Sequence, residues 1–138
     1  MTNYNPLQVK QGVLYPCHSL ILQFFVIDGT LSVSMYQRSA DVFLGLPFNI
    51  ASTSLLLTII SKLTNLKPGN VTINLGDCHI YKEHYEQVIT QLKRIPYQFP
   101  ILEIPDFTSI REIENSSYQD YKITEYHSHP RIKAKMIS

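Results

Sequence analysis

Cys17 is the residue of this sequence best suited to covalent catalysis. It stands at the predicted start of a strand, and a cysteine is a useful nucleophile only as a thiolate, which needs a nearby positive charge or base. His18 would point to the opposite face of that strand, which makes it a poor general base for Cys17. From this segment alone, the favoured interpretation is a buried structural cysteine.

Arg38 and Ser39 end the next predicted strand and could hold a phosphate group. A guanidinium fork and a hydroxyl together suit that ligand. If the two strands form a hairpin, Arg38 comes alongside Cys17, where its charge would favour the thiolate. The alternative for Arg38 is an exposed salt bridge with Asp41.

Three further side chains could recognise a small molecule. Asn49 lies near a predicted helix start, where its amide could either cap the helix or read the edge of a base. His79 and Tyr81 are two residues apart, so in an extended segment both face one side and could bond one sugar hydroxyl. Neither this pair nor His127 with His129 has the spaced thiolates or carboxylates of a metal site, so we expect no metal.

The composition is that of a globular protein with one core. The chain has 138 residues, of which 44% are hydrophobic and 17% charged, so we expect one domain over residues 1–138. Twelve basic and eleven acidic residues leave a formal net charge of +1, which gives no sign of a nucleic-acid or anionic-membrane partner. Two cysteines are too few for a disulfide framework, and the first residues show no secretory signal, so we expect a cytoplasmic location.

The pattern of apolar residues predicts the α+β class, with strands in hairpin order and two inserted helices. Asp28-Gly29 suits a tight turn between the first two strands, and Gly76-Asp77 would close a short third strand. Residues 42–61 carry no charge, but Pro47 and several polar residues interrupt the run, so we expect a buried core helix and no membrane span. The predicted strands are 20–27, 31–38, 71–75, 101–104 and 123–126, and the predicted helices are 47–63 and one from about 82 to before Pro96.

Five sequence blocks match one known family in content and order. The longest is Tyr36-Gln-Arg-Ser-Ala-Asp-Val-Phe-Leu-Gly-Leu-Pro-Phe-Asn-Ile-Ala-Ser52, which is far more specific than any single motif. The others are Tyr15-Pro-Cys-His18, Leu66-Lys-Pro-Gly69, Gly76-Asp-Cys-His-Ile-Tyr81 and His129-Pro-Arg-Ile-Lys133. With these blocks the chain resembles the C-terminal half of thymidylate synthase. The resemblance implies part of that family's α+β domain, a mixed or antiparallel sheet with packed helices.

The resemblance also implies an activity, the reductive methylation of dUMP to dTMP in de novo dTMP biosynthesis. Methylene-tetrahydrofolate would be the cosubstrate, and Cys17 would form a covalent adduct with the pyrimidine. In related cytosine-hydroxymethylating enzymes an acidic residue replaces the amide of Asn49, so asparagine favours uracil here. The implied site residues are Cys17 and Arg38 for catalysis, Gln37, Arg38, Ser39, Asn49, His79 and Tyr81 for the substrate, and Asp41 for the folate.

Two departures from the family pattern keep two hypotheses open. Family members are about twice as long, and the N-terminal phosphate arginine, the proton-transfer glutamate and the folate-site tryptophans have no counterpart here. The first hypothesis is a catalytic half that works as a homodimer or with a complementing N-terminal segment, and the second is a truncated, inactive relative that binds nucleotide or pairs subunits. The other departure is one extra residue between Cys17 and Gln23, which in a strand would reverse the faces unless a bulge absorbs it.

Overall fold

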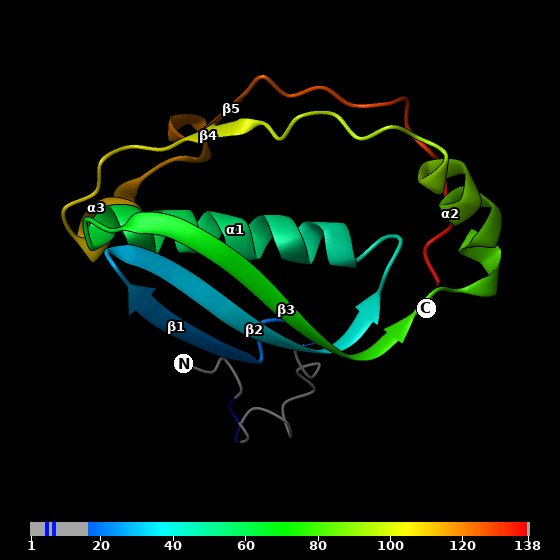
Figure 1. Ribbon diagram of the computed structural model, residues 1–138, viewed down its shortest axis with the longest axis horizontal. Coiled ribbons are helices and arrows are strands. Elements are labelled where there is room, and N and C mark those ends of the chain that lie inside the picture. The colour runs from blue at the N-terminus through cyan, green and yellow to red at the C-terminus, as the bar shows by residue number, and fades with distance from the viewer. Residues whose placement is uncertain (1–4, 6, 8–16, 138) are drawn as a thin grey trace. The chain divides into compact units, whose positions relative to one another are not determined.

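The computed structural model describes residues 5, 7 and 17–137, and the chain divides into two compact units (Figure 1). The first unit is Met1–Ile80 and the second is Tyr81–Ser138. Each unit mixes helices and strands, in agreement with the predicted α+β class. The extent of one domain over residues 1–138 stays a prediction.

A hairpin of two long strands opens the described part of the first unit. Strand β1 (Ile21–Ile27) pairs antiparallel with β2 (Thr30–Asp41), in an unbroken register from Ile21 opposite Tyr36 to Ile27 opposite Thr30. The turn is made by Asp28 and Gly29, whose φ angles are 48° and 73°. Two successive positive φ angles give the tight turn whose twist matches the strands, so the predicted hairpin is confirmed.

Strand β3 (Lys67–His79) is much longer than the predicted strand 71–75, and Gly76 and Asp77 lie inside it rather than closing it. It pairs parallel with β2 from Thr30 opposite Lys67 to Asp41 opposite His79, which makes β2 the central strand. A Cβ atom at Gly76 would lie 2.7 Å from the carbonyl oxygen of Arg38. Gly76 therefore marks a close approach of two backbones, not the end of a strand.

Helix α1 (Leu46–Leu63) carries Pro47 in its first turn, and Figure 1 shows it lying along one face of the sheet. Its buried residues recur every four positions at Asn49, Thr53, Leu57 and Ser61, so one face of the helix packs on β2 and β3. Among the described helices, α1 alone is long and apolar enough to cross a membrane, a test that core helices also pass. The core cluster that it helps to form contains Leu22, Leu31, Val33, Met35 and Leu57.

The second unit is built from short elements. A 3-10 turn η2 (Lys82–His84) leads into α2 (Tyr85–Leu92), which confirms the predicted second helix with a tighter first turn. Strands β4 (Ile101–Glu103) and β5 (Lys122–Thr124) pair antiparallel, each shorter than predicted. Between them lie helix α3 (Ile110–Asn115) and the 3-10 turn η3 (Tyr118–Asp120), in a stretch where we predicted no helix.

Candidate functional site

Cys17 lies directly beside the later part of β2. The backbone N–H of Arg38 donates to the carbonyl oxygen of Cys17 over 2.8 Å, and the N–H of Ser39 approaches the same oxygen at 3.5 Å. Cys17 is exposed and its thiol forms no disulfide. The predicted proximity of Cys17 and Arg38 is therefore confirmed at the level of the backbone. Because Cys17 is exposed, its interpretation as a buried structural cysteine is wrong.

Residues 17–20 form a bend before β1, so the expectation that Cys17 and His18 occupy the start of a strand is wrong. Ser19 has a φ of 55°, and its N–H lies 3.4 Å from the sulfur of Met35. The ring Nδ1 of His18 lies 3.2 Å from the hydroxyl oxygen of Ser19. The register of β1 is unbroken from Ile21 onward, so the bulge considered for the expected extra residue does not occur in β1. Tyr15 and Pro16 of the first matching block lie outside the described residues.

Gln37 and Asn49 form a buried pair between β2 and α1. The Nε2 of Gln37 donates to the Oδ1 of Asn49 at 2.9 Å and to the carbonyl oxygen of Ser39 at 3.0 Å. Gln37 is 1% exposed and Asn49 is 9% exposed. The N-cap of α1 is Gly45, so the capping role considered for Asn49 is excluded. The pair fixes the orientation of the Asn49 amide: its Oδ1 faces Gln37, and its Nδ2 remains a donor for another group.

Asp41 holds the turn that leads from β2 into α1. Its Oδ1 accepts from the N–H groups of Phe43 at 3.0 Å and Leu44 at 3.2 Å, and its backbone oxygen accepts from the N–H of Gly45. Within the described residues no ion pair joins Asp41 to Arg38, so the salt bridge considered as an alternative does not form. Arg38 keeps its charge for another partner.

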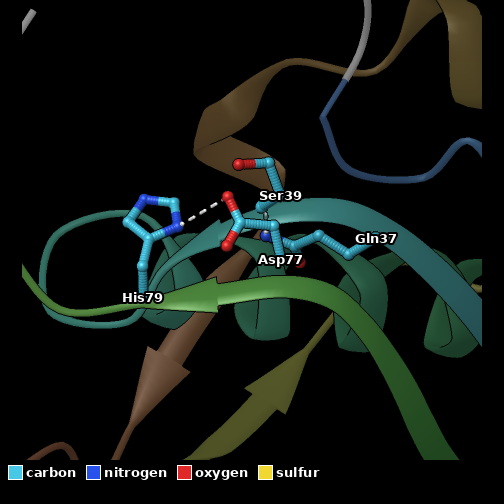
Figure 2. A network of polar contacts seen from close by, with 4 residues as sticks. All are labelled: Gln37, Ser39, Asp77 and His79. Atoms are coloured by element: carbon cyan, nitrogen blue, oxygen red, sulfur yellow. Dashed lines mark hydrogen bonds and ion pairs between the residues drawn. The ribbon is translucent and has the colours of Figure 1, made fainter.

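The ends of β2 and β3 carry a group of polar residues, of which Figure 2 shows Gln37, Ser39, Asp77 and His79. Ser39 stands opposite Asp77 in the register, and Asp41 stands opposite His79. The Nδ1 of His79 lies 3.4 Å from the Oδ2 of Asp77, and the His79 side chain is 28% exposed. Asp77 and His79 are two apart on one strand and so share a face, a signal the sequence carried but that we did not use. The carboxylate can orient the imidazole of His79.

Tyr81 opens the second unit, as the residue that precedes η2. Its ring meets that of His84 edge to face, with centroids 5.7 Å apart and an interplanar angle of 82°. His84 is fully buried. His79 thus belongs to the first unit and Tyr81 to the second.

His127 and His129 both lie against Tyr97, with ring centroids 6.1 Å and 4.7 Å away. The Nε2 of His129 lies 2.9 Å from the carbonyl oxygen of Ile95, so it acts as the donor in a structural hydrogen bond. Within the described ranges no group of three histidine, cysteine, aspartate or glutamate side chains could hold a metal ion.

The family model described as thymidylate synthase matches residues 1–138, the whole chain. The chain belongs to the thymidylate synthase family. It is also 46% identical over 136 residues to a curated thymidylate synthase from Mycoplasma pneumoniae. That alignment covers 99% of this chain and 46% of the relative, so the chain spans about half the length of the thymidylate synthase it matches.

The structure shows contacts for two residues, Asp77 and His84, that the sequence analysis did not select. Asp77 contacts His79, and its position two residues earlier on one strand could have indicated this. His84 contacts Tyr81, but a single histidine before a helix gives no such indication in a sequence. The structure thus places Cys17, Arg38 and Ser39 together and pairs Gln37 with Asn49, both in the first unit.

Proposed function

We propose that this chain is the nucleophile-bearing part of a thymidylate synthase that methylates dUMP to dTMP. The observation that carries the proposal is the 2.8 Å hydrogen bond from the N–H of Arg38 to the carbonyl oxygen of Cys17. It holds an exposed thiol next to a residue whose cation forms no ion pair within the described chain. Nucleophilic catalysis by cysteine needs an accessible thiol and a nearby positive charge, which the side chain of Arg38 would supply.

Cys17 would add to carbon 6 of the uracil ring. A carbon–sulfur bond forms, the carbon 5–carbon 6 double bond opens, and the negative charge spreads to carbon 5 and the adjacent carbonyl oxygen. Carbon 5 is then nucleophilic enough to accept a one-carbon unit. Methylene-tetrahydrofolate supplies that carbon and the hydride when bound. The bond between that carbon and the folate nitrogen would break, the hydride would end on the same carbon to make it a methyl group, and the folate would leave as dihydrofolate. Loss of the carbon 5 proton and departure of the Cys17 thiolate would restore the ring double bond.

Arg38 and Ser39 would bind the phosphate of dUMP. A guanidinium forms two charge-assisted hydrogen bonds to a phosphate, and the serine hydroxyl adds a third donor. Because both backbones contact Cys17, phosphate binding would also set the distance between the nucleotide and the thiol.

Asn49 would read the uracil edge, with Gln37 as its support. The Gln37 bond occupies one lone pair of the Asn49 Oδ1, which leaves the Nδ2 to donate to a ring carbonyl and the second lone pair to accept from the ring N–H. This pattern of donor and acceptor matches uracil. Cytosine carries an amino group in place of that carbonyl and no ring N–H, so it would be rejected.

His79 and Tyr81 would bond the deoxyribose hydroxyl, and Asp41 would face the folate pterin. The Oδ2 of Asp77 lies 3.4 Å from the Nδ1 of His79, so the carboxylate would favour the ring orientation that presents Nε2 to the sugar. One oxygen of Asp41 is committed to the turn before α1, so the other would serve the pterin.

A partner would complete the enzyme, either a second copy of the chain or a separate N-terminal segment. Leu22 belongs to the core cluster and Phe24 packs against it, so the alternate residues of β1 lie on the other face of the sheet. Ile21, Phe25 and Ile27 on that face are 52%, 43% and 63% exposed. An apolar strand face of this kind favours burial against another chain.

The alignment covers only 46% of the relative. This partial coverage favours a second candidate function, that of an inactive module that binds nucleotide or pairs subunits. An equilibrium binding measurement tests nucleotide binding, which both candidate functions include. We expect the chain, alone or with the unmatched part of the Mycoplasma pneumoniae relative, to prefer dUMP to deoxyuridine by about tenfold or more, since charge-assisted bonds are the stronger ones. Arg38→Ala should remove that preference, and Thr90→Ala on α2 should not. Equal affinity of the parent chain for both compounds would contradict the proposed phosphate site.

A further inference from the structure

His84 is a fully buried side chain that joins two segments of the second unit. It ends η2, and its backbone N–H donates to the carbonyl oxygen of Tyr81 at 2.9 Å. Its ring Nε2 lies 2.8 Å from the carbonyl oxygen of Lys135. Figure 1 shows the C-terminal segment running beside α2.

The bond to Lys135 fixes the orientation of the imidazole. A carbonyl oxygen only accepts, so the proton of this bond must sit on the Nε2 of His84. The ring therefore cannot turn over without breaking a buried hydrogen bond, which is costly where water cannot replace the partner. A second side chain bonds the C-terminal segment: the Nε2 of Gln87 donates to the carbonyl oxygen of Lys133 at 3.5 Å.

The ring of Tyr81 contacts the imidazole of His84. The two rings meet nearly perpendicular, at 82° with centroids 5.7 Å apart, which is the favoured edge-to-face geometry of aromatic pairs. The backbone bond from His84 to Tyr81 closes the same turn. Both the main chain and the ring of Tyr81 thus contact His84.

We propose that His84 is the positioning residue that aims the phenol of Tyr81 at the sugar hydroxyl of the nucleotide. This inference rests on the proposed role of Tyr81 in binding dUMP. His84 itself is buried and does not touch the substrate. It acts through Tyr81, and it links the geometry of the sugar site to the backbone at Lys135.

A comparison of two nucleotides isolates this role. The only free hydroxyl on the sugar of dUMP is at the 3′ position, so 2′,3′-dideoxyuridine monophosphate removes the group that Tyr81 would bind. We expect the parent protein to prefer dUMP to the dideoxy compound by about tenfold, the worth of one good hydrogen bond. Tyr81→Phe should abolish the preference. His84→Phe keeps a ring but loses the bond to Lys135, and it should lower the preference several-fold with little effect on the dideoxy compound.

Two further measurements guard against a variant that does not fold. His84→Gln retains an N–H donor of similar reach, and we expect it to keep more of the preference than His84→Phe. In the parent protein labelled with nitrogen-15, the hydrogen-bonded Nε2–H signal of His84 should shift on binding dUMP but not the dideoxy compound.

The possible failures are distinct. If the parent protein binds neither nucleotide, or binds both equally, the proposed role of Tyr81 falls and this inference falls with it. If the parent protein discriminates and Tyr81→Phe does not, while folded His84→Phe discriminates as well as the parent, only the inference about His84 is overturned. A His84 signal that does not respond to dUMP would overturn it as well.

Discussion

The N–H of Arg38 donates to the carbonyl oxygen of Cys17 over 2.8 Å, and this bond ties the bend before β1 to the end of β2. It uses only main-chain atoms, so it fixes the position of Cys17 while leaving the thiol free of disulfide and exposed. It also places the candidate nucleophile next to the candidate phosphate ligand. The distance between a phosphate bound by Arg38 and Cys17 would therefore vary little.

Cys17 should react faster than Cys78 with an alkylating reagent. Both cysteines are exposed, so accessibility does not separate them, but Arg38 lies beside Cys17 and Asp77 precedes Cys78. A nearby cation favours the thiolate and a nearby carboxylate disfavours it. Mass-mapped labelling of the folded chain at neutral pH should show several-fold faster modification of Cys17, and Arg38→Ala should reduce that difference. Preferential labelling of Cys78 would show that Arg38 does not act on Cys17.

Gly76→Ala should weaken the pairing of β2 with β3. The added methyl group would lie 2.7 Å from the carbonyl oxygen of Arg38 and 2.9 Å from the hydroxyl oxygen of Tyr36, so the strands must move apart. Overpacking of this kind costs about 1–3 kcal/mol of the free energy of unfolding. Urea unfolding measures the loss, with Thr72→Ala at an exposed position of β3 as control. A variant as stable as the parent would mean that the two backbones are farther apart than described.

Gln37→Leu should cost about 1–3 kcal/mol of the free energy of unfolding, because it leaves the buried Oδ1 of Asn49 without its donor. The double variant with Asn49→Leu should recover part of the loss, since both polar partners are then gone. Ser54→Ala is the matched control, because its hydroxyl bonds the carbonyl oxygen of Ile50 at the surface. If the losses of the two single variants simply add in the double variant, the two side chains do not interact.

Glu112 should make the start of α3 sensitive to acid. Hydrogen bonds from the backbone N–H and the hydroxyl of Thr108 hold the pKa of this carboxyl below its usual range. Its stabilising effect is therefore fully present above the usual glutamate pKa, about 4.3, and is lost as the pH falls through the lowered value. Amide exchange in α3 should be faster in Glu112→Gln than in the parent at neutral pH, and the difference should vanish in acid. Glu114→Gln is the control, and a difference that does not change with pH would contradict the assignment.

The hairpin and α1 could be predicted because local chemistry specifies them. Asp28 and Gly29 tolerate the positive φ angles of the turn, and Pro47 suits a first helical turn. The full length of β3 could not be predicted in this way. Gly69 and Gly76 usually end strands, and only the close approach of β2 explains their presence inside one. The short polar helix α3 lacks the apolar periodicity by which helices are recognised, and it is stabilised instead by contacts around Thr108, Ser109 and Glu112.

In the candidate site, too, some contacts follow from local sequence and others depend on tertiary packing. The hairpin register implied that Arg38 would lie near Cys17, and the structure agrees. The Gln37–Asn49 bond and the edge-to-face contact of Tyr81 with His84 depend on how α1 and the C-terminal segment pack, which no local pattern encodes. The bend at Ser19 is a further case, because a serine in the left-handed region cannot be expected from its residue type.

Release of tritium from dUMP labelled at carbon 5 tests the central claim most directly. The reaction requires Cys17 to add to carbon 6 before the carbon 5 hydrogen can leave. We therefore expect release in the presence of methylene-tetrahydrofolate when the chain is combined with the unmatched part of the Mycoplasma pneumoniae relative. Neither part alone should release tritium, nor should the combination carrying Cys17→Ser, whereas Cys78→Ser should retain activity. Turnover by the Cys17→Ser combination would contradict the account, as would no release from a parent combination shown to be folded, associated and bound to dUMP.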